Sequence, residues 1–162
     1  HSFPTRRSSD LSFAKDNLNL IRRRFDEAFP KVEVDDSIYY DFEIGSGVAD
    51  LEDFLRISDK MEPFGEGNRE PIVLIKNIKI GKMFGTCFEK CKYMGGGTEH
   101  LSITTEQGYK MVCFNMGSEL TPDEVNRWSY VDVIGKVKRN WYKGYAYRQV
   151  VVSQIRKAEY HK

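Results

Sequence analysis

The segment from Arg139 to Arg148 holds four aromatic and three cationic side chains around a single glycine. Aromatic rings stack on unpaired bases, each contact contributing about 1–3 kcal/mol, and Lys and Arg side chains contact the phosphates of the same strand. We expect Gly144 to form a turn between two strands, so that this segment binds single-stranded nucleic acid. The alternative is that its tyrosines only cover one end of the domain as cross-strand pairs.

Cationic side chains elsewhere in the second half of the chain extend this predicted site. A charge on a strand is usually a solvated face, but these residues share one sign, which favours a common groove for a polyanion. If Val150 and Val152 face the core, then Tyr145, Tyr147 and Gln149 share the opposite face of their strand. The predicted nucleic-acid contacts are Lys92, His100, Lys110, Lys138, Arg139, Trp141, Tyr142, Lys143, Tyr145, Tyr147 and Arg148.

The residue types that support hydrolysis or metal binding do not form a recognisable pattern. Cys87 and Cys91 are four apart, but His100 does not complete a usual zinc spacing with them. Asp41 and Glu43 could ligate magnesium, but no His or Lys accompanies them, and we interpret them as solvated residues on the outer face of a strand. We therefore predict no catalytic residue, no metal ligand and no cofactor within this chain.

Charge is distributed unevenly along the chain, although the formal net charge is only +1. Residues 1 to 70 hold 10 Lys and Arg against 16 Asp and Glu, a balance of −6, whereas residues 71 to 162 hold 15 against 8, a balance of +7. This asymmetry indicates that the C-terminal part faces a polyanion. Three cysteines are too few for a disulfide framework and fit a reducing cytoplasm. No apolar run approaches the roughly 20 residues of a membrane helix.

The N-terminal half is predicted to contain two helices and one strand. Residues 1–11 show no periodicity, so we expect a disordered or non-native leader there. Apolar spacing predicts a helix over Lys15–Phe29, a half-buried strand over Val32–Ile44 and a second helix from Val48 to Met61. These elements cannot close a core alone, so they are either the end of a larger α/β domain or a clamp on the C-terminal domain.

The C-terminal half follows a turn-rich hinge at Pro63–Asn68 and is predicted to be mainly β. A helical insert over Pro122–Trp128, with Thr121 as its N-cap, lies between the third and fourth strands, and we expect Trp128 to anchor it to the core. Five strands with a helix in this place indicate the five-stranded Greek-key barrel called an OB-fold, which often binds oligonucleotides. The predicted strands are Ile72–Phe84, His100–Thr105, Tyr109–Asn115, Tyr130–Arg139 and Tyr145–Ile155.

Two stretches resemble the RecJ family of bacterial single-strand-specific DNA exonucleases. The first, Met61-Glu-Pro-Phe-Gly-Glu-Gly-Asn-Arg-Glu-Pro71, is similar to the family's Leu-Glu-Pro-Phe-Gly-x-Gly-Asn-Pro-x-Pro linker. It has Met61 in place of the Leu and Arg69 in place of the first Pro. The second is the closing Asn140-Trp141 with Gly144, Gln149 and Ile155. Phe114-Asn-Met-Gly117 also resembles the end of the family's third strand, and the resemblance extends from Ser12 to the end of the chain.

The resemblance implies a mainly β chain with an α/β remnant. Residues 12–46 would be the end of the DHH-associated domain, residues 47–70 a helical connector and linker, and residues 71–162 the OB-fold domain. It also implies a whole protein that degrades single-stranded DNA from the 5′ end with a divalent metal, Mg or Mn, during recombination and repair in the bacterial cytoplasm. The family's catalytic Asp-His-His motif lies upstream, so we expect this fragment to be inactive alone.

The partners implied by the resemblance are single-stranded DNA and the N-terminal nuclease core, without a membrane. A different class of function is a non-enzymatic OB-fold module that docks a protein or braces a domain, with its tyrosines packed against the nuclease core. A third hypothesis, hydrolysis of phosphodiesters by this chain itself, conflicts with the lack of a ligand cluster.

Overall fold

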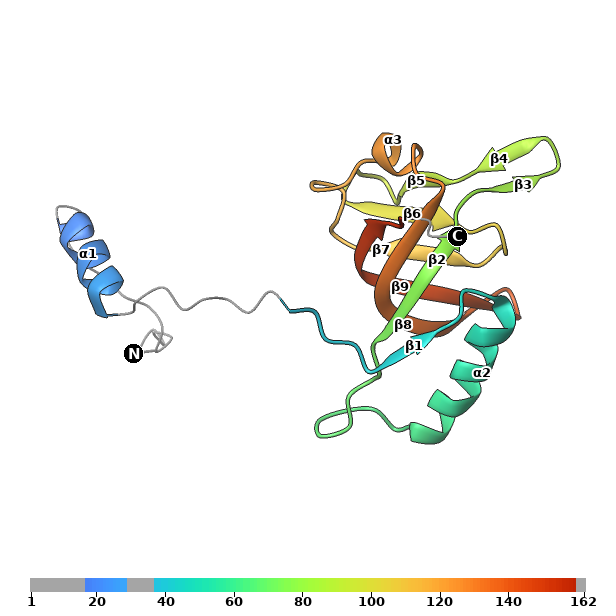
Figure 1. Cartoon of the computed structure of the whole chain (residues 1–162), viewed down its shortest axis with the longest axis horizontal. Helices are drawn as coiled ribbons and strands as arrows, with labels where there is room; N and C mark the ends of the chain where they lie inside the picture. The colour runs from blue at the N-terminus through green and yellow to red at the C-terminus, as the bar shows by residue number, and fades with distance from the viewer. Residues whose placement is uncertain (1–16, 29–36, 160–162) are drawn as a thin grey trace, which may run out of the picture. The chain divides into compact units, whose positions relative to one another are not determined.

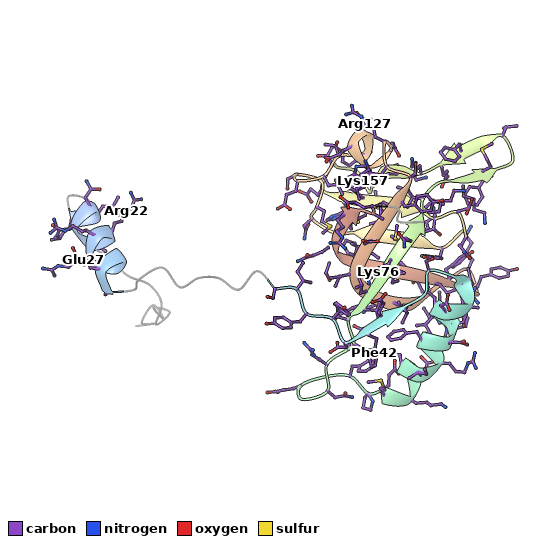
Figure 2. All side chains as sticks on the ribbon, viewed as in Figure 1. Arg22, Glu27, Phe42, Lys76, Arg127 and Lys157 are labelled. Atoms are coloured by element: carbon purple, nitrogen blue, oxygen red, sulfur yellow. The ribbon has the colours of Figure 1, made fainter. Side chains whose placement is uncertain are left out.

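The computed structural model describes residues 17–28 and 37–159, which belong to two compact units divided at Ile38 and Tyr39. In the first unit, helix α1 (Leu18–Ala28) lies within the predicted helix Lys15–Phe29. Charged side chains such as Arg22 and Glu27 project from it (Figure 2). The Nε atom of Arg23 lies 3.6 Å from the carboxylate of Glu27, one turn further along. The predicted leader over residues 1–11 lies outside the described residues.

The second unit is built on a seven-stranded sheet with the strand order β1-β2-β8-β9-β7-β6-β5 (Figure 1). A separate two-stranded hairpin, β3–β4, projects from it. In chain order the strands are β1 (Phe42–Ile44), β2 (Val73–Lys79), β3 (Lys82–Phe84), β4 (Cys87–Glu89), β5 (Cys91–Met94), β6 (His100–Thr104), β7 (Lys110–Cys113), β8 (Tyr130–Tyr142) and β9 (Tyr145–Lys157).

The long antiparallel pair of β8 and β9 forms the centre of this sheet. Strand β9 pairs on its other side with β7, and this pairing is parallel because the chain crosses over between β7 and β8. Alternation decides which side chains enter the core. Val133 and Val137 of β8 are buried, as are Val150 and Val152 of β9. The predicted core-facing side of the last strand is therefore confirmed.

The prediction of a closed five-stranded barrel is wrong, because the sheet is open, with β1 at one edge and β5 at the other. The predicted strand Ile72–Phe84 is broken where Gly81 adopts a φ of +102°. A Cβ on Gly81 would lie 2.4 Å from the Phe88 ring, so this kink requires glycine. The chain then forms the β3–β4 hairpin and β5. Strand β3 is the end of the predicted strand, whereas β4 and β5 were not predicted. An isolated bridge pairs Ile80 with Thr105 at the end of β2. The Gly81 N–H donates to the Thr104 carbonyl oxygen at 2.7 Å, and the Glu106 N–H donates to the Lys79 carbonyl oxygen at 2.9 Å.

Helix α2 (Val48–Ser58) continues as a 3₁₀ turn, η2 (Asp59–Met61), which confirms the predicted second helix. Gly47 is its N-cap, and the Gly47 N–H donates to the Asp50 carboxylate at 3.0 Å. Leu51 is completely buried and belongs to the same apolar core as the sheet strands. Helix α2 therefore clamps this sheet, one of the two roles predicted for the N-terminal half.

The predicted strand Val32–Ile44 is much shorter in the structure. Only Phe42–Ile44 are in a strand, residues 37–41 are not, and residues 32–36 lie outside the described residues. This short β1 pairs in parallel with β2, opposite Val73 to Ile75. The Asp41 carboxylate accepts a hydrogen bond from the Ile72 N–H at 2.8 Å, which explains why extended pairing begins directly after it.

The Pro63–Asn68 segment forms a closed loop around the side chain of Asn68. The Asn68 amide donates to the carbonyl oxygens of Met61 and Pro63, at 2.8 and 2.9 Å. Gly65 and Asn68 exchange two backbone hydrogen bonds, while Gly67 has a φ of +82°. The predicted hinge is thus a structured turn whose amide and glycine are required by its geometry.

The predicted insert helix is a single turn, α3 (Pro122–Val125), and not the longer Pro122–Trp128. Thr121 caps it as predicted, since its hydroxyl accepts the Glu124 N–H at 3.3 Å. Trp128 packs against the core, which confirms its predicted role. Within the described residues, no helix is long and apolar enough to cross a bilayer.

Candidate nucleic-acid interface

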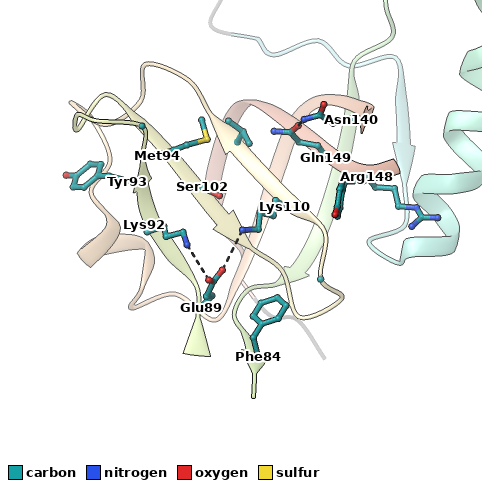
Figure 3. Close-up of a pocket in the computed structure, with 14 residues that line it drawn as sticks. Phe84, Glu89, Lys92, Tyr93, Met94, Ser102, Lys110, Asn140, Arg148 and Gln149 are labelled. Carbon is teal, nitrogen blue, oxygen red and sulfur yellow. Dashed lines mark hydrogen bonds and ion pairs between the residues drawn. The ribbon is translucent and has the colours of Figure 1, made fainter. Parts of the chain in front are cut away.

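A groove of about 690 Å³ lies on the outer face of the sheet, opposite the buried valines (Figure 3). Strands β5, β6, β7, β8 and β9 all contribute side chains to it, and β3 and β4 of the hairpin add one each. Its chemistry is mixed, with aromatic rings, cations, amides and a hydroxyl. The residues that carry these groups are Phe84, Lys92, Tyr93, Ser102, Lys110, Asn140, Tyr147, Arg148 and Gln149.

Strand register brings these side chains together from distant parts of the sequence. Thr104 of β6 lies opposite Lys110 of β7, and Lys110 lies opposite Gln149 of β9. Lys92 of β5 lies opposite Ser102 of β6. Directly opposed residues in a sheet share a face, so these rows run across the strands and form the floor of the groove.

A carboxylate holds the two lysines of the groove. The Lys92 Nζ lies 3.3 Å from one Glu89 oxygen, and the Lys110 Nζ lies 3.6 Å from the other (Figure 3). The hydrogen bond from Lys92, followed by the charge of Lys110, lowers the pKa of Glu89 from its ordinary value. Glu89 is therefore ionised at neutral pH, and both lysines are charged partners of the same anion.

The β8 and β9 side of the groove carries an aromatic ring beside two amides. Asn140 lies opposite Tyr147 in the ladder, and the Asn140 amide donates to the Gln149 side-chain oxygen at 3.1 Å. The Tyr147 ring is half exposed, at 50%. An exposed ring beside hydrogen-bonding amides can stack on a base and contact its edge.

Four of the predicted contacts meet in this groove: Lys92, Lys110, Tyr147 and Arg148. Arg148 also turns toward α2, where its Nε atom donates to the Glu52 carboxylate (Figure 3). Its guanidinium therefore lies at the rim of the groove and is already engaged by an acidic residue.

Three further predicted contacts line a second depression of about 400 Å³ instead: Lys138, Arg139 and Trp141. The Arg139 guanidinium lies 3.0 Å from Asp59, and the hydrogen bond that it donates to this carboxylate raises the pKa of Arg139. The Lys138 Nζ lies 3.3 Å from Glu70. Trp141 is 67% exposed beside them.

Three of the remaining predicted contacts, His100, Lys143 and Tyr145, line neither of these depressions. The His100 Nδ1 accepts the Asn115 N–H at 3.0 Å, and its ring meets that of Phe114 edge to face. Lys143 lies in the turn between β8 and β9 with a φ of +50°, and Tyr145 is 71% exposed. Nothing is described of the Tyr142 side chain.

The side chains of the Arg139–Arg148 segment are thus divided between two depressions, whereas the sequence predicted a single cluster. The sequence contained the signal for this division. Because Val137 faces the core, alternation places Asn140 on the outer face of the strand and Trp141 on the face of Val137. Asn140 was therefore predictable as a groove residue. Phe84 and Tyr93 were not, since they depend on the hairpin and β5, whose strands are only three and four residues long.

The cysteines do not supply a metal site. Burial raises the pKa of the Cys91 thiol to about 11 and that of Cys113 to about 12, whereas Cys87 is exposed. Across residues 17–28 and 37–159, no three His, Cys, Asp or Glu side chains converge in a way that could hold a metal ion. The described part of the chain therefore does not fit a catalytic metal.

Comparison with known proteins identifies a family model and solved structures that are similar to this chain. The family model described as the RecJ OB domain matches residues 40–154. Two solved structures of RecJ from Thermus thermophilus are similar to the chain. The complex with Mn²⁺ is 25% identical with a TM-score of 0.47, and covers 68% of this chain and 14% of its own. The complex with Mg²⁺ is 24% identical with a TM-score of 0.49, and covers 70% and 16% respectively.

The chain thus spans about 14–16% of the length of these solved relatives. No curated protein matches it. The family match covers most of the chain, including β1, α2 and every strand of the groove. The chain belongs to the RecJ OB-domain family.

Proposed function

We propose that this domain binds single-stranded DNA in the groove on its outer sheet face and performs no chemistry itself. The observation that carries the proposal is the convergence of Lys92, Lys110 and Tyr147 from three different strands on one open groove. A tyrosine ring stacks on a base, and lysines contact the phosphates on either side of it. This arrangement suits a strand whose bases are unpaired.

The size of the groove supports a short contact. Its volume of about 690 Å³ is within the range of roughly 300–1,000 Å³ that holds a ligand of drug size. We infer that it takes about one nucleotide with its flanking phosphates. Phe84 and Tyr93 lie along the same groove, so neighbouring bases can stack on further aromatic rings.

We further propose that the whole protein is a 5′-to-3′ single-strand-specific exonuclease of recombination and repair in the bacterial cytoplasm. Family membership supports this proposal. The divalent metal, Mg or Mn, would bind in a nuclease core outside the described residues. Residues 12–46 would then belong with the DHH-associated domain, 47–70 would be the connector and 71–162 the DNA-holding domain. We expect this chain alone not to cleave a labelled oligonucleotide in Mn²⁺, and cleavage would contradict this expectation.

The test of the proposed function is the affinity of the whole 162-residue chain for fluorescent oligo-dT, measured by anisotropy at several salt concentrations. We expect the affinity to fall steeply with salt. Tyr147→Ala should weaken binding by about 1–3 kcal/mol through loss of stacking, and Lys110→Ala should also reduce the salt dependence. The matched controls are Tyr40→Ala, an exposed tyrosine outside the groove, and Lys79→Ala, an ion-paired lysine outside it.

A second candidate function is supported by Trp141. This ring is 67% exposed and lines a depression whose other members include the apolar Phe64 and Val137 and the acidic Glu70. A large exposed aromatic residue with paired charges around it is typical of a protein contact. The bracing role predicts that Trp141→Ala weakens capture of the nuclease core of the same enzyme. It predicts no change in oligo-dT affinity, whereas loss of oligonucleotide binding would assign Trp141 to DNA.

A further inference from the structure

We propose that Glu89 occupies the place of a DNA phosphate in the groove and acts as an internal competitor. In this role it sets how tightly and how selectively the groove binds. The inference rests on the proposed function, because it assigns a selectivity role to one residue of the same groove. It concerns an acidic residue at a site that is otherwise suited to a polyanion.

The position of Glu89 supports this role. It is the last residue of β4, where the hairpin returns to the sheet, and its carboxylate lies between Lys92 and Lys110 (Figure 3). The Thr104 hydroxyl donates to the same carboxylate at 3.5 Å. Two ammonium groups and a hydroxyl around one anion are the groups that would also surround a phosphate oxygen.

The Glu89 side chain is more buried than the side chains of both lysines that it contacts. The side chain of Glu89 is 29% exposed, against 58% for Lys92 and 46% for Lys110. Among the described residues that line the groove, Glu89 is the one carboxylate. The lysines therefore remain accessible to solvent, while the Glu89 carboxylate already neutralises part of their charge.

A ligand must displace this carboxylate before it gains both lysines. A mononucleotide offers one phosphate, which would replace the Glu89 carboxylate as the partner of the lysines. This exchange adds little binding free energy. A strand offers several phosphates, and its bases also stack on Tyr147 and Phe84, which adds free energy that Glu89 cannot supply. A strand can therefore bind through stacking and its other phosphates without displacing Glu89, whereas a mononucleotide cannot. Glu89 thus lowers the affinity for single nucleotides more than the affinity for strands.

The chain contains a matched control for this exchange. The Glu70 carboxylate lies 3.2 Å from the Lys136 Nζ and 3.3 Å from that of Lys138, so it also bridges two lysines. It lines the second depression and not the groove. Glu89→Gln and Glu70→Gln thus make the same change in net charge and free the same number of lysines at two different places.

The experiment measures the affinity of the wild type and both variants for oligo-dT and for thymidine monophosphate. We expect Glu89→Gln to bind oligo-dT about two- to tenfold more tightly, the range expected from two exposed ion pairs. Its log–log salt slope should steepen by about 0.7 for each additional phosphate contact. Binding of the monophosphate should increase by a larger factor than that of the strand, while Glu70→Gln should change neither.

Four outcomes would overturn the inference. Equal tightening by both variants would indicate a general charge effect, and weaker binding by Glu89→Gln would mean that Glu89 only positions the lysines. A Glu89→Gln gain that persists in the Lys92→Ala, Lys110→Ala background would exclude the exchange. Failure of the proposed function looks different, because neither the wild type nor any variant would then bind oligo-dT. If the wild type binds and Lys110→Ala weakens it while Glu89→Gln changes nothing, only this inference fails.

Discussion

Arg139 and Arg148 lie directly opposite each other in the β8–β9 ladder. Two like charges in this position repel, and Glu52 of α2 compensates both. The Arg148 Nε donates to one Glu52 oxygen, and the Arg139 Nη2 lies 3.8 Å from the other. These contacts join α2 to strands β8 and β9, and β9 carries Tyr147. Arg139 and Arg148 therefore also stabilise the fold.

Replacement of Glu52 should reveal this structural role. We expect Glu52→Gln to lower the free energy of unfolding by about 1 kcal/mol, because the arginine pair loses its shared anion. The value is modest because all three side chains are about a third exposed. Urea denaturation of the whole chain measures it. The control is Asp53→Asn, which breaks an exposed ion pair with Arg56 within α2. An equal loss in both variants would contradict the prediction.

Gly117 should not tolerate a side chain. A Cβ on this residue would lie 1.7 Å from the Thr98 carbonyl oxygen, and the Gly117 N–H donates to the Glu99 carbonyl oxygen at 3.0 Å. Gly117→Ala must therefore push two backbone segments apart, which we expect to cost at least about 1–3 kcal/mol. The control is Gly97→Ala, since no atom lies within 4 Å of a Cβ there. Thermal unfolding of both variants provides the comparison, and similar melting temperatures would refute this explanation.

The loop that resembles the RecJ linker should depend on the amide of Asn68. Asn68→Asp keeps the size of the side chain but removes two donated hydrogen bonds and places a negative charge beside two carbonyl oxygens. We expect a loss of about 1–3 kcal/mol of stability. Limited proteolysis and urea denaturation report on the loop and on the whole domain, respectively. The control is Glu66→Gln, which changes only the exposed tip of the loop. Unchanged stability and cleavage would show that the amide is dispensable.

The cysteines should differ in reactivity at pH 8. Iodoacetamide should modify the exposed Cys87 and leave the buried Cys91 and Cys113 unmodified, because burial raises the pKa of the latter two to about 11 and about 12. Mass spectrometry after native labelling measures this, and labelling in urea should modify all three. Rapid modification of Cys91 or Cys113 in the native chain would be the contrary result.

The same pKa shifts predict a loss of stability at alkaline pH. Above about pH 8.5, an unfolded thiol releases its proton, while Cys91 keeps its proton up to about pH 11. The unfolded state then binds fewer protons, so stability falls as pH rises through this window. Burial also raises the pKa of Tyr109, which adds a loss in the same direction above about pH 10. Urea midpoints at pH 7.5, 9 and 10.5 test this, and a flat profile would contradict it.

Local patterns in the sequence predicted much of the secondary structure correctly. The apolar stripe from Val48 to Met61 became α2 and its 3₁₀ extension, and Thr121 caps α3. These features depend on residues three or four positions apart, whose interactions do not require the rest of the fold. The sequence did not predict the β3–β4 hairpin, because strands of three residues are too short for a periodic signal.

By itself the sequence determined which side of β9 is buried, because strict alternation around Val150 and Val152 leaves Tyr147 and Gln149 outside. Only the tertiary structure decided the partners of the cations. Glu52 is 96 residues from Arg148, and Glu89 reaches Lys110 through a hairpin that projects from the sheet. Alternation is a property of a single strand, whereas ion pairing depends on strand order and curvature, which arise from packing of the whole chain.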